Sequence, residues 1–237
     1  MEYCKSQERA NTAWEFAKLQ HDAPDLFDAS ATQPDKRVED LTSQDLANSF
    51  CACATHHQDP PSLPTPSASD PTKRVDNFTP QNLANTAWAY ATLQHDSLDL
   101  FDAIATQATK SMDEFKSQEL ANTAWAFAKL HHDSPDLFDA IATQTDKRVE
   151  DLTSQALANT VWAFATLQHD SPDLLDAIAT QATKRVDNFT PQNLANTGWA
   201  CATLQHHSPD LIDAIATQAT KRLDEFNPQR MADTAGQ

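Results

Sequence analysis

The stretch that decides the fold is residues 78–114, which read FTPQNLANTAWAYATLQHDSLDLFDAIATQATKSMDE. Residues 115–151 repeat it closely as FKSQELANTAWAFAKLHHDSPDLFDAIATQTDKRVED. The same 37-residue step fixes the position of every tryptophan in the chain, with one unit skipped: Trp14, Trp88, Trp125, Trp162 and Trp199. A fixed period of this length is the sequence signature of repeat architectures. The chain is therefore predicted to be an array of structural repeats.

Six units of this length fill residues 4–225, which we expect to form a single array. The units are 4–40, 41–77, 78–114, 115–151, 152–188 and 189–225, and residues 226–237 begin a seventh, truncated unit. The unit 41–77 is degenerate, because the proline-rich segment 58–71 stands where its second helix should be. That many prolines exclude a regular helix, so a loop is expected there. A compensated pair of frameshifts across 56–71 would explain why the period survives.

Each unit contains two helical patterns, as the unit 78–114 illustrates. Its first pattern spans residues 79–95, with Thr79 suited to the N-cap and Pro80 to the first turn. One broad face of this helix is apolar and consists of Leu83, Ala84, Ala87, Trp88, Tyr90 and Ala91. The alanines on that face let a neighbouring helix approach closely, and Trp88 is expected to fill the volume between units.

The second pattern of this unit runs from about Asp99 to Glu114. Its expected buried side consists of Leu100, Phe101, Ile104, Ala105, Ala108 and Met112. In the next unit, Ser134 is the expected N-cap of this helix and Pro135 its first residue. Acids gather at the start of the second helices and Lys-Arg pairs at their ends, which complements the helix dipole. A structural role is favoured for these pairs over a phosphate contact.

A two-helix unit of this length cannot bury its apolar face alone, so stacked units must share one continuous core. The predicted fold is therefore all-α, a right-handed α-solenoid of two-helix repeats with a 37-residue period. In such a solenoid the first helices line one surface and the second helices line the other.

The composition narrows the class of function. The chain carries 34 acids and 17 bases, a net charge of −17, and only two glycines. Scarce glycine excludes a Gly-rich phosphate loop or dinucleotide fingerprint, and the acidity opposes binding to an anionic membrane. No apolar run reaches transmembrane length, and neither a signal peptide nor a transit peptide is visible. We expect an intracellular protein that binds no membrane and no small-molecule substrate.

Two groups of residues could carry metal or catalytic chemistry. Cys51, Cys53, His56 and His57 are dense enough to be a weak zinc candidate, but each of the first three simply replaces a core residue of the repeat. No metal and no cofactor is therefore expected. Histidines also recur at the turns, at His21, His95, His132, His169 and His206. Their repetition favours helix-end capping and packing over catalysis, so an enzyme is not expected.

The segments FTPQNLANTAWA (78–89) and SPDLFDAIA (134–142) resemble the helical repeats of algal organelle RNA-binding proteins. These include octotricopeptide-repeat chloroplast translation factors, and related arrays with leucine-rich and RAP modules like those of the FAST-kinase family. The resemblance covers essentially the whole chain. It implies a solenoid that binds single-stranded RNA in a chloroplast or mitochondrion and acts in RNA processing, stability or translation. The acidic charge favours an alternative, a protein–protein interaction scaffold without RNA binding.

The polar arc of the first helices supplies the candidate RNA contacts. In the unit 78–114, Asn82, Asn85, Ala89 and Thr92 fall within about 80° of one another on an ideal helix. The candidates across the array are Asn11, Lys18, Asn82, Asn85, Thr92, Asn122, Lys129, Asn159, Thr166, Asn193, Asn196 and Thr203. Modular RNA readers use two or three side chains per repeat in this way. For the constant asparagine, a ladder of hydrogen bonds between repeats is favoured over base contact, because buried amides need partners.

Overall fold

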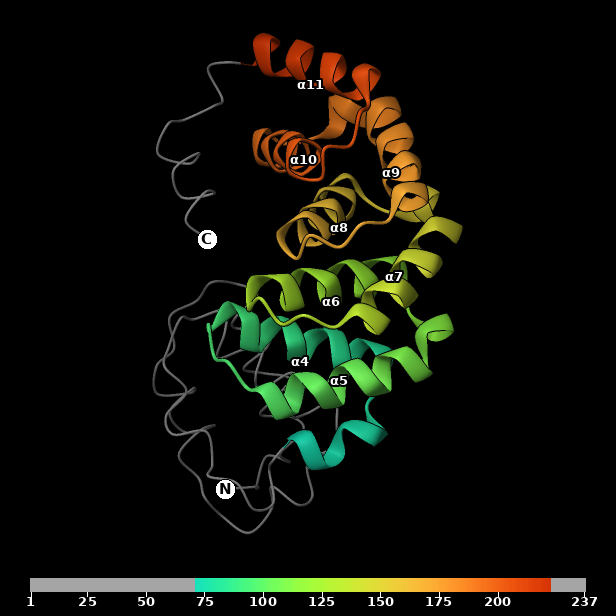
Figure 1. Ribbon diagram of the computed structural model, residues 1–237, viewed down its shortest axis with the longest axis vertical. Helices are drawn as coiled ribbons and strands as arrows, with labels where there is room; N and C mark the ends of the chain where they lie inside the picture. The colour runs from blue at the N-terminus through green and yellow to red at the C-terminus, as the bar shows by residue number, and fades with distance from the viewer. Residues whose placement is uncertain (1–70, 223–237) are drawn as a thin grey trace, which may run out of the picture. The chain divides into compact units, whose positions relative to one another are not determined.

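The computed structural model describes residues 71–222 of the chain (Figure 1). Over this range the protein is all-α, with eight α-helices, four 3-10 helices and no strand. The chain divides into two compact units, Met1–Ser111 and Met112–Gln237. Each unit is described by itself.

The described part of the first unit consists of one 3-10 helix and two α-helices. They are η2 (Pro71–Asn77), α4 (Pro80–Thr92) and α5 (Leu98–Lys110). α5 packs against both α4 and η2. The Thr79 hydroxyl accepts a hydrogen bond of 3.3 Å from the Asn82 amide, which confirms the predicted N-cap. Both α-helices end earlier than the sequence indicated, because a tight turn closes α4 and a separate 3-10 helix follows α5.

The second unit repeats one α-helical pair three times. Its elements are η3 (Met112–Glu114), α6 (Ser117–Lys129), α7 (Pro135–Lys147), η4 (Val149–Asp151), α8 (Ser154–Thr166), α9 (Pro172–Arg185), η5 (Val186–Asn188), α10 (Pro191–Thr203) and α11 (Pro209–Lys221). α8 packs against both α6 and α10, and α9 packs against α7 and α11. Figure 1 shows these as two rows, which we name the first-helix layer (α6, α8, α10) and the second-helix layer (α7, α9, α11).

The core of the second unit lies between the two layers. Phe127 on α6 and Phe164 on α8 occupy the same repeat position, and both are fully buried. The ring of Phe164 packs against Phe138 of α7 with 5.0 Å between centroids. Buried alanines along α6 and α8 let neighbouring first helices approach closely. In the first unit, the predicted apolar side of α5 is buried as expected. It consists of Leu100, Phe101, Ile104, Ala105 and Ala108, and Met112 beyond the helix is also buried.

Two kinds of N-terminal boundary alternate along the chain. Thr153 caps α8 and Thr190 caps α10, each through a hydroxyl that accepts from the third amide beyond it at 3.1 Å. Ser134 occupies the N-cap position of α7 as predicted, but its side chain makes no capping hydrogen bond. Pro135 at the first helical position carries no N–H, so it removes one of the amides that the start of a helix leaves without a partner. Proline alone does not account for the missing cap, because α4 and α10 also begin with proline and are capped by threonine.

The first helices end in a turn whose type the sequence did not predict. After α8, Gln168 adopts a left-handed backbone with φ of 54°. The Gln168 amide donates to Ala165 at 3.2 Å, and the His169 amide donates to the Phe164 carbonyl at 2.9 Å. This pair of bonds is a Schellman motif, which usually places glycine at the left-handed position. Gln94, His131 and Gln205 adopt the same conformation after α4, α6 and α10. Because glycine does not mark these positions in the sequence, the type of turn was not predicted.

Because Gln168 has a left-handed backbone, replacing it with glycine should stabilise the protein, whereas the same substitution within a helix should destabilise it. Gln168→Gly is expected to raise the free energy of unfolding by about 0.5–1 kcal/mol, because glycine has no β-carbon to clash in this conformation. Gln155→Gly, on the exposed side of α8, is the matched control and should lower stability by a similar amount. Urea denaturation followed by circular dichroism measures both. Loss of stability in both variants would contradict the strain at Gln168.

Candidate nucleic-acid interface

The first position of the predicted contact arc is not available to a ligand. Asn82 is 6% exposed and Asn193 is 8% exposed. Both are the third residue of their helix, where the backbone amide donates to the capping threonine. At the same position in α6, the Glu119 carboxylate accepts from the Lys116 amide at 2.8 Å. This position therefore serves the helix start and the core, which corrects the expectation of an exposed contact.

The constant asparagine lies closer to solvent. Asn85, Asn122, Asn159 and Asn196 are all half-buried. The Asn122 side-chain oxygen accepts from Gln118 at 2.8 Å within the same helix. Within residues 112–222, no hydrogen bond joins Asn122, Asn159 and Asn196 to one another. The expected ladder is therefore not formed within these residues. The half-buried amides can bond to water or to a ligand instead.

The fourth position of the arc is mixed. The hydroxyls of Thr92 and Thr166 each donate to the carbonyl of the tryptophan four residues earlier, at 2.8 Å. Thr203 is exposed, and Lys129 is half-buried. Burial lowers the pKa of the Lys129 ammonium below its ordinary value. While these bonds persist, the hydroxyls of Thr92 and Thr166 can accept a hydrogen bond from a ligand but cannot donate one.

Several predicted residues lie outside the described part of the chain. Among the RNA candidates these are Asn11 and Lys18, and the weak metal candidate Cys51, Cys53, His56 and His57 lies outside it as a whole. Between residues 71 and 222 no group of three or more histidine, cysteine or acidic side chains is placed to hold a metal ion. Burial raises the pKa of the Cys201 thiol, so this cysteine behaves as a core residue.

The surface that the first helices present is a stripe of four side chains per helix. Each stripe contains glutamine, asparagine, tryptophan and a lysine or threonine at spacings of four, three and four residues. In the second unit they are Gln118, Asn122, Trp125 and Lys129; Gln155, Asn159, Trp162 and Thr166; and Gln192, Asn196, Trp199 and Thr203. The glutamines are exposed, Trp125 and Trp162 are half-buried, and Trp199 is 47% exposed. We call these twelve residues the amide–tryptophan stripe.

The exposed stripe overlaps the predicted arc only in part. On an ideal helix with 100° per residue, Gln155, Asn159, Trp162 and Thr166 are centred opposite the buried Leu157. The predicted arc was centred about 50° away from this direction. It included the buried alanine Ala163 and omitted both the glutamine and the tryptophan. Because α8 packs between α6 and α10, residues on both flanks of the helix are buried, and only a narrow sector reaches solvent.

The two residues of each Lys-Arg pair have different surroundings. The Arg185 guanidinium donates to the Leu152 carbonyl at 2.6 Å and lies 3.4 Å from the Val149 carbonyl. Arg148 donates to the carbonyls of Phe115 and Asp113, and Arg222 donates to Phe189 at 2.6 Å. The structural role predicted for the arginines is therefore confirmed. The adjacent lysines, Lys147, Lys184 and Lys221, are exposed.

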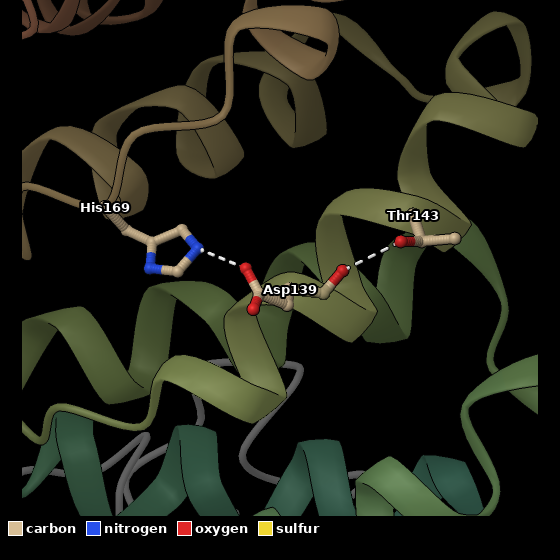
Figure 2. Close-up of polar contacts among 3 residues, drawn as sticks. All are labelled: Asp139, Thr143 and His169. Atoms are coloured by element: carbon tan, nitrogen blue, oxygen red, sulfur yellow. Dashed lines mark hydrogen bonds and ion pairs between the residues drawn. The ribbon is translucent and has the colours of Figure 1, made fainter.

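The turn histidine connects consecutive helical pairs. The His169 ring, from the turn after α8, points at Asp139 of α7 with 3.0 Å between Nε2 and Oδ1 (Figure 2). The same ring packs against Phe138 and Phe164. His206 and Asp176 lie 3.3 Å apart in the next pair, within ion-pair distance but without a hydrogen bond. The predicted packing role of the turn histidine is confirmed, and its carboxylate partner is an addition.

Between residues 71 and 222, no helix has the length and apolar character that crossing a membrane requires. A family model described as RNA-editing substrate-binding complex 6 protein matches residues 95–231. The match covers more than half of the chain and includes all of the second unit that the structure describes. No curated protein matches the chain. The matched family is RNA-associated, as the resemblance implied, but it is not the octotricopeptide-repeat or the FAST-kinase family.

Proposed function

Because the chain belongs to the RNA-editing substrate-binding complex 6 protein family, we propose that it binds RNA as a non-catalytic member of a complex that processes organellar RNA. The family match is the observation that carries this proposal. The described structure is compatible with it, because the first-helix layer presents a regular polar and aromatic surface built from three equivalent helices. RNA-binding repeat proteins use such surfaces, one set of side chains per repeat.

The proposed architecture is a right-handed α-solenoid of two-helix repeats that extends over residues 4–225. The supporting observation is the spacing of α6, α8 and α10, which begin at Ser117, Ser154 and Pro191, 37 residues apart. The two-layer packing of the second unit is what stacked helical pairs produce. In a solenoid of this kind, the stripe of each unit would lie beside the stripe of the next.

The proposed mode of action is binding and not catalysis. The stripe consists of amides, indoles, hydroxyls and one ammonium group, Lys129. Amides and indoles hydrogen-bond and stack, but they do not transfer protons near neutral pH. No cofactor is part of the proposal. The turn histidines, such as His169, are occupied in packing between helical pairs.

The proposed location is an organelle, and the mitochondrion is preferred to the chloroplast. The resemblance implied either organelle and included translation among the possible roles. The family match supports RNA editing and gives no support to a chloroplast translation factor. RNA processing is therefore the biological process in which we expect the chain to act.

A scaffold function is the second candidate, and one observation favours it. The second-helix layer exposes an aspartate pair at the start of each helix, as in Asp136 and Asp139 of α7 or Asp173 and Asp176 of α9. An acidic outer layer attracts basic protein surfaces and repels nucleic acid. The name of the matched family also refers to a complex. Protein partners on this layer are compatible with RNA on the first-helix layer.

Binding of the full chain to a random pool of single-stranded RNA tests the proposed function. We expect retention of RNA at low salt in a filter-binding or mobility-shift assay. Inorganic polyphosphate of similar length is the control, because it offers charge without bases and should compete poorly. An absence of RNA binding at low salt, together with a normal helical spectrum, would leave the scaffold function as the better account.

A further inference from the structure

We propose, on the premise that the chain binds RNA, that the amide–tryptophan stripe accepts unpaired bases of single-stranded RNA, with the phosphates directed to solvent. Three features of the stripe select this class of RNA and its orientation: the aromatic groups, the amides and the near absence of charge.

The aromatic groups are placed to stack with bases. Each first helix of the second unit contributes one indole, from Trp125, Trp162 or Trp199, and each is partly accessible to solvent. Unlike the fully buried rings of Phe127 and Phe164, each indole therefore keeps a surface that a base can reach. Stacking on aromatic side chains is the main way in which proteins hold unpaired bases, and it tolerates any base.

The amides flank each indole along the helix. Asn159 precedes Trp162 by three residues and Gln155 precedes it by seven, so all three side chains lie on one sector of α8. Each amide offers both donors and an acceptor. A base that stacks on the indole would therefore find hydrogen-bonding groups on one side, suited to its Watson–Crick or Hoogsteen edge.

The charge of the stripe decides the orientation of the RNA. Lys129 is the one cation among the twelve residues, and none of them is acidic. Arg148, Arg185 and Arg222 donate to backbone carbonyls of the protein. Phosphates that faced this surface would remain almost unneutralised in a chain with a net charge of −17. Bases carry no net charge, so the arrangement with bases inward and phosphates outward has the lower electrostatic free energy.

The same chemistry excludes duplex RNA as the ligand. A duplex hides its base faces by stacking and its Watson–Crick edges by pairing, and it presents phosphates and 2′-hydroxyls. The spacing of the helices agrees with this exclusion. Packed helices lie about 8–10 Å apart, whereas bases stacked in a helix are about 3.4 Å apart. A strand that crosses α6, α8 and α10 therefore has to unstack its bases, and the indoles replace the lost stacking.

The test compares three probes on the full chain. They are a random-sequence single-stranded RNA, the same RNA annealed to its complement, and an abasic ribose-phosphate strand of equal length. We expect at least tenfold weaker binding of the duplex and the abasic strand. For the single strand, a rise from about 50 to about 200 mM salt should weaken binding only about threefold, as expected for one phosphate contact and not for six or more.

Variants at Trp162 locate the binding surface. Trp162→Ala is expected to weaken single-strand binding by between about fivefold and a hundredfold, and Trp162→Phe should retain most of the affinity. Lys184→Ala, which changes an exposed residue outside the stripe, is the matched control and should have little effect. Melting curves establish whether each variant folds. If Trp162→Ala does not fold, the comparison of the three probes on the unchanged chain still tests the inference.

The outcomes separate the inference from the proposed function. Binding of all three probes with similar affinity and a steep salt dependence would overturn the inference and leave RNA binding in place. Equal effects of Trp162→Ala and Lys184→Ala would do the same. Failure of every RNA probe to bind would overturn the proposed function itself.

Discussion

Replacing Phe164 with alanine is expected to lower the free energy of unfolding by about 3–5 kcal/mol, the range for truncating a fully buried aromatic side chain. The Phe164 ring contacts Phe138 of α7, at 5.0 Å between centroids, and the ring of His169, at 5.5 Å. Its removal would leave a cavity between the two layers. The backbone around it is fixed by α6 and α10 on both sides of α8, which limits collapse into the space.

Urea denaturation followed by circular dichroism measures this loss, and Phe164→Leu provides a graded comparison. Leucine fills part of the ring volume, so we expect a loss of roughly 1–2 kcal/mol. The repeat itself varies at this position, with Tyr90 in α4 and Cys201 in α10, and both are buried. A change below about 1 kcal/mol for Phe164→Ala would mean that the two layers do not form one cooperative core.

The period of the sequence predicts the helices because each unit obeys the same local rules. Thr79, Thr153 and Thr190 precede helices that they cap, and apolar residues recur at helical spacing on the buried faces. These signals depend on neighbours within a few residues, so they are legible from one unit. The boundaries were less accurate, since the Schellman turns use glutamine or histidine where glycine is usual.

The exposed surface was harder to predict because it depends on neighbours in space. Viewed as a single helix, α8 has an apolar face that includes Trp162 at its margin and a polar arc that includes Asn159 and Ala163. Packing between α6 and α10 buries both flanks and leaves Trp162 and Gln155 at the surface. A comparison of the units contained one usable signal. Glutamine recurs at the second helical position of α4, α6, α8 and α10, where no local rule requires it.

The role of the arginines was predicted only in part. The pairs at the ends of the second helices suggested an interaction with the helix dipole. The side chain of Arg185 instead reaches back 33 residues to Leu152 and further to Val149. Contacts of that separation cannot be read from a local pattern, but they repeat with the period once the first one is known.

Replacing Arg185 with alanine is expected to lower the free energy of unfolding by about 1.5–3 kcal/mol, the range for hydrogen bonds to charged groups. The guanidinium bonds to carbonyls that flank the 3-10 helix η4, including those of Leu152 at 2.6 Å and Val149 at 3.4 Å. Without the Arg185 side chain, these carbonyls lose their charged donor at the contact between the end of α9 and the start of the repeat 152–188. The measurement is urea denaturation of the full chain.

Two comparisons test whether the geometry of Arg185 or merely its charge is responsible. Arg185→Lys keeps the charge but offers one compact ammonium group instead of a planar fork, so it should recover less than half of the loss. Lys184→Ala removes an exposed cation next to it and should change stability by less than about 0.5 kcal/mol. Similar losses for Arg185→Ala and Lys184→Ala would show that the carbonyl contacts add no stability.

The repeat 78–114 lacks this arginine, so introducing one there tests the same contact in the opposite direction. Ser111 occupies the repeat position of Arg148, Arg185 and Arg222, and its hydroxyl donates only to Gln107 at 3.1 Å within the turn. Phe78 occupies the position of Leu152 and Phe189, whose carbonyls receive the guanidinium in the other units. Ser111→Arg should therefore raise stability by about 1 kcal/mol. A gain here and a loss at Arg185 would together establish that one arginine per repeat ties the end of each second helix to the start of its own unit.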